Sequence, residues 1–333
     1  MNIKYLSYLV CPVCKGDFFT EFKEKKTVIL NDKLICKSCK KSYPVNDGVP
    51  VLMNDIGAMK STQESFSNEW ALRNSGFFEK NLSSGYSKED RYKKILNILE
   101  IDQNILKNKL FLDAGCGDGV YGAHIAINNP QTLVFLADIS AGVKHTKEKL
   151  KNIDNCIVIQ CDLMRAPFKE GIFDYIWSDG VLHHTPNTRK AFNSVDQLVK
   201  VGGKFYVWLY PNYKKSYYLL VRDLMIKPYI LPVWILYLCS LILSFPYWIL
   251  CKIFNMYKLL FTPNVKQLLK KRTFMSVAFS IYDSISPTYQ FRHGKEEVKN
   301  WFDKNGYEDV KIVGDLGIVG IKKKSDIINN EKK

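Results

Sequence analysis

From residue 110 onward, short apolar runs alternate with longer segments whose apolar residues recur every three or four positions. The runs have strand length and the longer segments have helical spacing, an order typical of a parallel sheet covered by helices. The expected strands are 110–114, 132–138, 156–161, 173–178 and 204–210, and the expected helices are 119–128, 141–151 and 188–200. A later helix at 295–305 precedes two more expected strands, 310–314 and 317–321. The pattern therefore predicts an α/β fold.

A glycine-rich turn follows the first of these strands, in Phe111-Leu-Asp-Ala-Gly-Cys-Gly-Asp-Gly119. Glycines let the backbone turn sharply and approach a ligand closely, and the next helix points its N–H groups at that ligand. Two registers fit the turn. Asp113-x-Gly115-x-Gly117-x-Gly119 is the first motif of the class I methyltransferases that use S-adenosylmethionine, whereas Gly117-x-Gly119-x-x-Gly122 matches the dinucleotide fingerprint.

Acidic residues end the next two expected strands. In a parallel sheet, ligands bind at the carboxyl ends of the strands, so these side chains indicate the ligand. Asp138 stands 19 residues past Gly119, where a carboxylate accepts hydrogen bonds from ribose hydroxyls of either NAD or S-adenosylmethionine. Asp162 ends the third strand and is placed to accept a hydrogen bond from an adenine amino group.

Five motifs in order then favour the methyltransferase. They are Asp113-Ala-Gly-Cys-Gly-Asp-Gly119, Asp138-Ile-Ser140, Cys161-Asp-Leu163 with Pro167-Phe168, Phe173-Asp-Tyr-Ile176 with Val181-Leu-His-His184, and Leu198-Val-Lys-Val-Gly-Gly-Lys204. Residues 113–210 thus resemble the class I methyltransferases grouped with the ubiquinone and menaquinone C-methyltransferases. The resemblance implies a Rossmann-like sheet and S-adenosylmethionine as cofactor. An NAD-dependent dehydrogenase would not be expected to carry the Asp162 and Leu-His-His features.

The same resemblance implies roles for individual residues. The glycines Gly115, Gly117 and Gly119 would approach the methionine end of the cofactor. Asp113 would bind its amino group directly or through water, and Asp138, with Ile139 beside it, would bind the ribose. The adenine would lie between Asp162 and Leu163, and the sulfonium would lie beside Ser178.

Two adjacent histidines, His183 and His184, stand at the expected entrance for the acceptor. Because a sulfonium is already a good leaving group, catalysis depends mainly on alignment, and a base is needed only if the acceptor must lose a proton. One histidine would be that base, or both would shape and hydrogen-bond the loop.

Four cysteines near the start form two C-x2-C pairs separated by 21 residues: Cys11, Cys14, Cys36 and Cys39. This spacing is typical of a zinc ribbon, and four thiolates leave no open coordination position, so the Zn2+ ion is expected to be structural. The ribbon ends in Gly48-Val-Pro-Val-Leu52. Residues 5–52 resemble the small zinc-ribbon proteins that activate tRNA and protein methyltransferases.

Residues 54–109 are expected to form lid or linker helices. Phe66 and Trp70 are four residues apart and would share one helix face, either covering the cofactor or docking the helix on the core. Arg91 to Ile101 reads as a second, amphipathic helix.

An apolar stretch of 24 residues without a charge, 228–251, follows the fifth strand. Its flanks are basic, since residues 214–272 contain ten Lys or Arg and one acid, Asp223, a balance of +9 out of +15 for the chain. A single membrane crossing would separate strands of one sheet, and Pro232 and Pro246 predict a bent hairpin instead. We expect monotopic attachment to an anionic membrane face. The alternative is an internal apolar cap over the acceptor pocket.

The expected domains are a zinc ribbon (1–53), lid helices (54–109), the methyltransferase core (110–211), a helical insertion (212–285), the end of the core (286–324) and a tail (325–333). The start of the chain does not resemble a signal peptide, so a cytoplasmic location with reduced thiols is expected. The first functional hypothesis is methylation of an amphipathic or lipid-linked acceptor at the inner membrane face. The alternatives are an RNA methyltransferase, whose ribbon binds RNA or a protein partner, and a non-catalytic scaffold that binds the cofactor.

Overall fold

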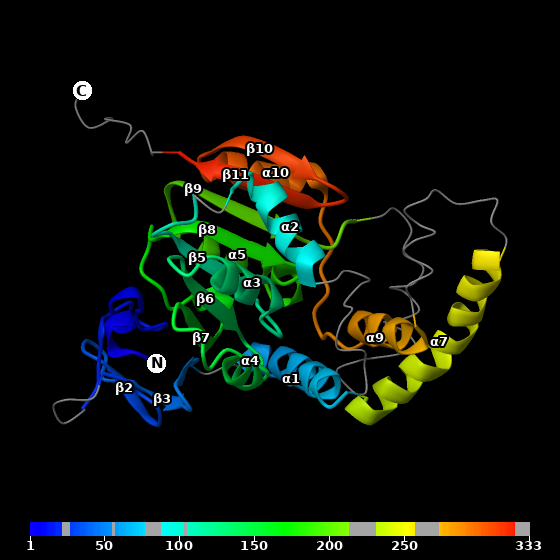
Figure 1. The fold of residues 1–333 in the computed structure, drawn as a ribbon, viewed down its shortest axis with the longest axis horizontal. Helices are drawn as coiled ribbons and strands as arrows, with labels where there is room; N and C mark the ends of the chain where they lie inside the picture. The colour runs from blue at the N-terminus through cyan, green and yellow to red at the C-terminus, as the bar shows by residue number, and fades with distance from the viewer. Residues whose placement is uncertain are drawn as a thin grey trace.

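The computed structural model describes residues 1–21, 27–54, 57–76, 88–102, 105–212, 231–256 and 273–323. The basic residues on either side of the apolar stretch, at 214–227 and 258–272, and the tail at 325–333 lie outside the described residues. Within the described residues, the chain folds around one continuous sheet in the order β1-β2-β3-β4-β7-β6-β5-β8-β9-β11-β10 (Figure 1).

The methyltransferase part of this sheet has seven strands. Their bounds are β5 Leu110–Ala114, β6 Leu133–Asp138, β7 Cys156–Cys161, β8 Phe173–Asp179, β9 Val199–Trp208, β10 Tyr307–Val313 and β11 Gly317–Lys322. The first five pair in parallel, and β11 pairs antiparallel with both β9 and β10. The central strands are buried on both faces, which is why they read as continuous apolar runs rather than alternating ones. The expected Rossmann-like α/β sheet is confirmed.

Helices cover both faces of this sheet. Phe192 of α5 (Thr188–Asp196) and Phe302 of α10 (Lys295–Lys304) pack with Phe205 on one face. On the other face, Ile95 of α2 (Lys88–Leu99) and Ile125 of α3 (Val120–Asn128) pack with Leu136. The remaining helix of the core is α4 (Val143–Lys149), and short 3-10 turns lie at Ile3–Tyr8, Gly57–Met59, Leu163–Arg165 and Leu182–His184.

Strand β9 differs from its prediction. The sequence predicts a strand at 204–210, whereas β9 already begins at Val199, includes both Gly202 and Gly203, and ends at Trp208. Gly202 has a φ of +79°, and the pairing with β8 shifts register between Phe173 and Tyr175. The glycines therefore form an irregularity within the strand, because the ladder resumes on both sides of them.

The N-terminal ribbon extends the sheet. Its strands are β1 Phe18–Phe19, β2 Asp32–Cys36, β3 Ser42–Asn46 and β4 Val49–Leu52. Strand β4 pairs in parallel with β7, at Val51 with Gln160 and Leu52 with Cys161. Further contacts join the two parts, since Val10 N donates to Pro167 O at 3.0 Å and the Tyr8 ring lies 5.5 Å from that of Phe135. The ribbon and the core thus share one sheet and one hydrophobic cluster.

Two helices of the insertion lie on the side of the molecule away from the ribbon (Figure 1). They are α7 Val233–Met256 and α9 Phe274–Ile285, which pack together through Leu236, Phe279 and Tyr282. The expected break at Pro246 is wrong, since α7 continues through it. Packing against α9 offsets the backbone hydrogen bond that a proline removes. Within the parts that the structure describes, no helix has the length and apolar character that a membrane span requires.

The helix α1 (Lys60–Asn74) connects these regions. It lies between the core and α9, beneath the carboxyl edge of the sheet in Figure 1. Ser65 Oγ donates a hydrogen bond to Ser286 O at 2.9 Å, and Ala141 N donates to Ser67 Oγ at 2.9 Å. These bonds hold α1 across the edge where parallel sheets bind their ligands.

Candidate active site and metal cluster

A cavity of about 450 Å³ lies at the carboxyl ends of the parallel strands. The ends of all five of these strands contribute to its lining, through Asp113, Asp138, Cys161, Asp179 and Trp208. Side chains of α1 and α9 form the opposite wall, among them Phe66, Trp70, Phe279 and Asp283. The carboxyl edge of the sheet, where an α/β fold of this kind is expected to bind its ligand, is therefore enclosed by α1 and by α9 of the insertion.

The glycine-rich turn enters this cavity at two of its three predicted positions. Gly115 and Gly117 line it, with φ angles of +91° and +54°. A Cβ atom at Gly117 would overlap the indole of Trp70, which lies directly against the turn. Gly119 does not line the cavity, because it faces Thr146 and Leu136 and begins α3 with a φ of +74°. Gly119 shapes the turn from inside the fold.

Two buried carboxylates fix the loops around the turn. Asp113 Oδ2 accepts a hydrogen bond from Gly122 N, and Asp138 accepts from Gly117 N and Ser140 N, each at 2.8 Å. Burial raises the pKa of Asp113 to about 7, and burial also raises the pKa of Asp138. Each carboxylate has lone pairs left to accept hydrogen bonds from a ligand. Both line the cavity with Ile139, as their predicted roles toward the cofactor require.

Two residues predicted to contact the adenine follow the third parallel strand, β7, and only one of them reaches the cavity. Leu163 lines the cavity, but Asp162 does not. The Asp162 carboxylate instead caps the 3-10 turn that follows, accepting a hydrogen bond from Met164 N at 2.8 Å. Its predicted adenine contact is therefore not visible in this arrangement, because the side chain turns toward its own backbone.

Ser178 also lies away from the cavity. Its side chain is fully buried, and Oγ donates to Ala114 O at 2.9 Å. Successive side chains of a strand point to opposite faces. Asp179, the next residue, lines the cavity and forms a salt bridge with Lys94 at 2.7 Å. Ser178, the residue predicted to lie beside the sulfonium, therefore does not reach the cavity, whereas its neighbour Asp179 does.

The two histidines separate in the same way. His184 lines the cavity, and its Nδ1 lies 2.8 Å from Tyr289 O, so Nδ1 must carry the proton that it donates. His183 is fully buried outside the cavity lining, and its ring nitrogens have no hydrogen-bond partner among the described residues. Burial holds the pKa of His183 well below its usual value, so its ring is neutral. Only His184 is placed to contact a bound acceptor.

The sequence analysis missed several residues of the cavity, above all Glu69 and Asp283. The first lies between Phe66 and Trp70 at helical spacing, so one helix face already contained all three. Asp283 is the only acidic residue between Asp223 and Glu296, in a stretch whose other charged residues are basic. An isolated acid in such a surrounding is the signal that was available for it.

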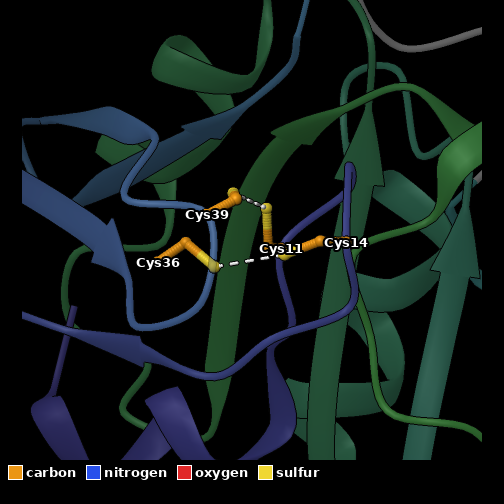
Figure 2. A group of neighbouring side chains, drawn as sticks. All are labelled: Cys11, Cys14, Cys36 and Cys39. Carbon is orange, nitrogen blue, oxygen red and sulfur yellow. Dashed lines mark hydrogen bonds between the residues drawn. The ribbon is translucent and has the colours of Figure 1, made fainter.

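The four ribbon cysteines form a second, separate cluster (Figure 2). Their sulfur atoms all lie within 4.8 Å of one another, with Cys11 to Cys39 at 3.7 Å and Cys14 to Cys36 at 3.4 Å. A tetrahedral zinc ion with Zn–S bonds of about 2.3 Å needs sulfur atoms about 3.8 Å apart. The donor set therefore fits a structural Zn2+ ion with no open coordination position.

Loss of this zinc should weaken the whole protein, because the ribbon shares its hydrophobic cluster with the core. For Cys36→Ser, we expect zinc content to fall from about one ion per chain to near zero. The midpoint of thermal unfolding should fall by at least about 5 °C, since losing ~2 kcal/mol shifts Tm by roughly this amount. Elemental analysis and calorimetry measure both. Cys239→Ser, outside the cluster, should keep the metal; an unchanged Tm in zinc-free protein would contradict the coupling.

The Gly117 contact with Trp70 predicts a second outcome. Gly117→Ala should weaken S-adenosylhomocysteine binding at least tenfold, because the new methyl group displaces the indole that covers the turn. The matched control is Gly171→Ala. Gly171 has a similar φ of +64° but no atom within 4 Å of its Cβ position, so it carries the same backbone strain of about 1 kcal/mol without the overlap. Titration calorimetry decides, and equal affinities in the two variants would argue against a ligand at this turn.

Comparison with known proteins agrees with both sites. Residues 112–207 match the family model described as a methyltransferase domain, and residues 3–48 match the one described as Trm112p-like protein. A UPF0434 protein of Methylobacillus flagellatus is 42% identical over 55 residues, which are 16% of this chain and 80% of that protein.

The core has relatives among characterised enzymes. A sterol 4-C-methyltransferase of Caenorhabditis elegans is 31% identical over 114 residues, which are 33% of this chain and 32% of that enzyme. The chain thus spans about a third of that relative's length. A solved complex of the Haloferax volcanii Trm112 methyltransferase activator with a putative methyltransferase is also similar, with 14% identity and a TM-score of 0.45. The match covers 79% of this chain and 97% of that one. The protein is therefore a class I S-adenosylmethionine-dependent methyltransferase that belongs, through residues 3–48, to the Trm112p-like UPF0434 zinc-ribbon family.

Proposed function

We propose that this methyltransferase modifies an amphipathic or lipid-linked acceptor at the cytoplasmic face of an anionic membrane. The observation that carries the proposal is an exposed apolar stripe on α7. It consists of Trp234, Leu238, Ile242 and Phe245, whose spacing of four, four and three residues places them on one helix face. Trp234 is 63% exposed and Ile242 69%. Contiguous exposed apolar surface of this kind typically marks a binding surface.

The charge of the sequence that flanks the stripe favours a lipid surface over a protein partner. The segment 214–272 carries ten basic residues against Asp223 alone. Basic residues beside an amphipathic helix attract anionic headgroups, and each contributes about 1 kcal/mol near such a surface. The opposite face of α7 is occupied, since Leu236 is 3% exposed and packs against α9. The helix would thus lie in the membrane interface with the enzyme behind it.

Helix α9 connects this surface with the cavity. Helix α9 packs on α7 through Ala278 and Tyr282, and it lines the cavity through Phe279, Ser280 and Asp283. An acceptor held at the membrane surface would therefore need to move only past α9 to reach the carboxyl edge of the sheet. Among the described residues, none of the stretch 228–251 lines the cavity, whereas α9 does, and this favours the membrane contact over the internal cap for α7.

Each part of the chain has a simple task in the reaction. Bound S-adenosylmethionine would supply a methyl group on a positively charged sulfur. Asp113 and Asp138 would hold the cofactor's polar groups, as their position on the cavity allows. Trp70 covers the turn, Phe66 lines the cavity beside His184, and both would help to exclude water, while His184 contacts the space left for the acceptor. The contribution of the protein is alignment of the two reactants.

The acceptor class is tested by incubating the protein with methyl-labelled cofactor and a cell extract, then separating lipid, RNA and aqueous solutes. We expect the label in the lipid fraction. Label in RNA would support the alternative of an RNA methyltransferase, with the ribbon binding RNA or a protein partner. If no fraction is labelled while S-adenosylhomocysteine still binds, the chain acts as a non-catalytic scaffold.

The exposed stripe gives a direct prediction for membrane binding. Replacing both Trp234 and Ile242 by Glu should weaken flotation with anionic vesicles at least tenfold, because burying each side chain contributes about 1.5–3 kcal/mol. The control is Ile127→Glu on α3, where the side chain is 51% exposed and remote from α7. Calorimetry should show S-adenosylhomocysteine affinity unchanged in all three proteins. Flotation of the double variant at the wild-type level would remove α7 as the membrane contact.

A further inference from the structure

Helices α1 and α9 pack side by side in antiparallel orientation, and together they form one wall of the cavity. At one end, Ser65 Oγ bonds to Ser286 O; at the other, the Arg73 guanidinium lies 5.4 Å from the Phe279 ring centroid. Glu69 stands midway between Ser65 and Arg73, one helical turn from each. It therefore faces the middle of α9, where Asp283 lies one turn beyond Phe279.

The carboxylate of Glu69 is buried without a full set of partners. Its side chain lines the cavity, the residue is 2% exposed, and Oε2 has no hydrogen-bond partner among the described residues. Arg73, one turn further along α1, forms its salt bridge with Asp118 instead, at 3.2 Å. A buried carboxylate oxygen without a donor costs several kcal/mol unless a ligand supplies one.

The charges of the cavity point to a positively charged ligand. Six acidic residues line it, namely Glu69, Asp113, Asp118, Asp138, Asp179 and Asp283, against two basic ones, Arg91 and Lys94. Six minus two leaves four excess acids by formal count, and the salt bridge of Arg73 with Asp118 reduces these to three, in a chain whose net charge is +15. S-adenosylmethionine adds only one net positive charge, since its carboxylate offsets one of its two cations. With the cofactor bound, two acids therefore remain in excess by formal count.

The pKa values of Glu69 and Asp283 also indicate a positively charged ligand. Burial and then the neighbouring Asp283 hold the pKa of Glu69 well above its usual range, and burial raises the pKa of Asp283 to about 6, although the nearby Arg73 guanidinium opposes both shifts. Two carboxylates that repel each other in a buried site share protons until a cation separates them. A bound cation would allow both to ionise.

Aromatic rings around these acids favour an organic cation over a metal ion. Phe66, Trp70, Phe279 and Tyr210 line the same cavity, and the Phe66 ring lies 5.2 Å from that of His184. Ring faces attract ammonium groups, whereas Mg2+ and Ca2+ need six or more oxygen ligands. The surroundings thus suit a nitrogen with carbon substituents.

We propose that Glu69 and Asp283 form the acceptor subsite of this methyltransferase and bind a positively charged amine on the methyl acceptor. The inference rests on the proposed function, whose cavity it uses, and it names the chemical class of the acceptor. An amine on an amphipathic molecule satisfies both surfaces, with its apolar part along α7 and its cationic group between α1 and α9.

The test is a binding measurement on the full chain saturated with S-adenosylhomocysteine. The probes are dodecylamine and dodecanol in nonionic detergent micelles, together with soluble ethanolamine. For the wild-type protein, dodecylamine should bind at least tenfold more tightly than dodecanol. Glu69→Gln and Asp283→Asn keep the side-chain shapes and should reduce this ratio to twofold or less. The control, Asp303→Asn, removes an exposed acid on α10 and should leave the ratio unchanged.

Each result has a distinct meaning. Equal binding of the amine and the alcohol to wild-type protein overturns the subsite, and this comparison needs no variant to fold. If the variants lose S-adenosylhomocysteine affinity instead, the two carboxylates hold the cofactor, and the inference is wrong. If ethanolamine binds as tightly as dodecylamine, the subsite stands but the lipid part of the proposed function fails. Absence of any S-adenosylhomocysteine binding would remove the proposed function itself.

Discussion

Hydrogen bonds from backbone N–H groups to buried carboxylates hold the carboxyl edge of this sheet in one shape. Asp138 accepts from both the glycine-rich turn and its own following loop, and Asp113 accepts from the start of α3. A carboxylate without water must be satisfied by such donors, so the loops that provide them cannot move independently. The close approach of Gly117 to Trp70 follows from this fixed turn, and it places α1 over the cavity.

The sequence predicts the parts that depend on local pattern. The runs at 110–114 and 156–161 match β5 and β7, because strands buried on both faces are apolar throughout. Asp113 and Asp138 are predicted as cavity residues because parallel strand ends meet at one edge. Pro246 and the glycines of β9 are predicted wrongly, since packing against α9 and pairing with β8 outweigh local preference there.

Other features of the site depend on contacts that no local pattern contains. Ser178 and Asp179 are adjacent in β8 and point to opposite faces, and only the packing around the strand decides which of them reaches the cavity. Glu69 and Asp283 are more than 200 residues apart in sequence, and only the packing of α1 on α9 brings them to the same wall. Their pairing could be found from the sequence only by asking which isolated acids lie on apolar helix faces.

Helix α9 is the element that connects the two unusual properties of this chain. Ala278, Tyr282 and Ile285 lie in the cluster with α7, Asp283 lines the cavity, and Phe279 does both. A helix with both faces occupied cannot shift on one side without disturbing the other. Contact of α7 with an apolar surface would therefore stabilise the same arrangement of α9 that forms the acceptor wall. In this way the position of the acceptor and the shape of its subsite depend on one packing interaction, between α7 and α9.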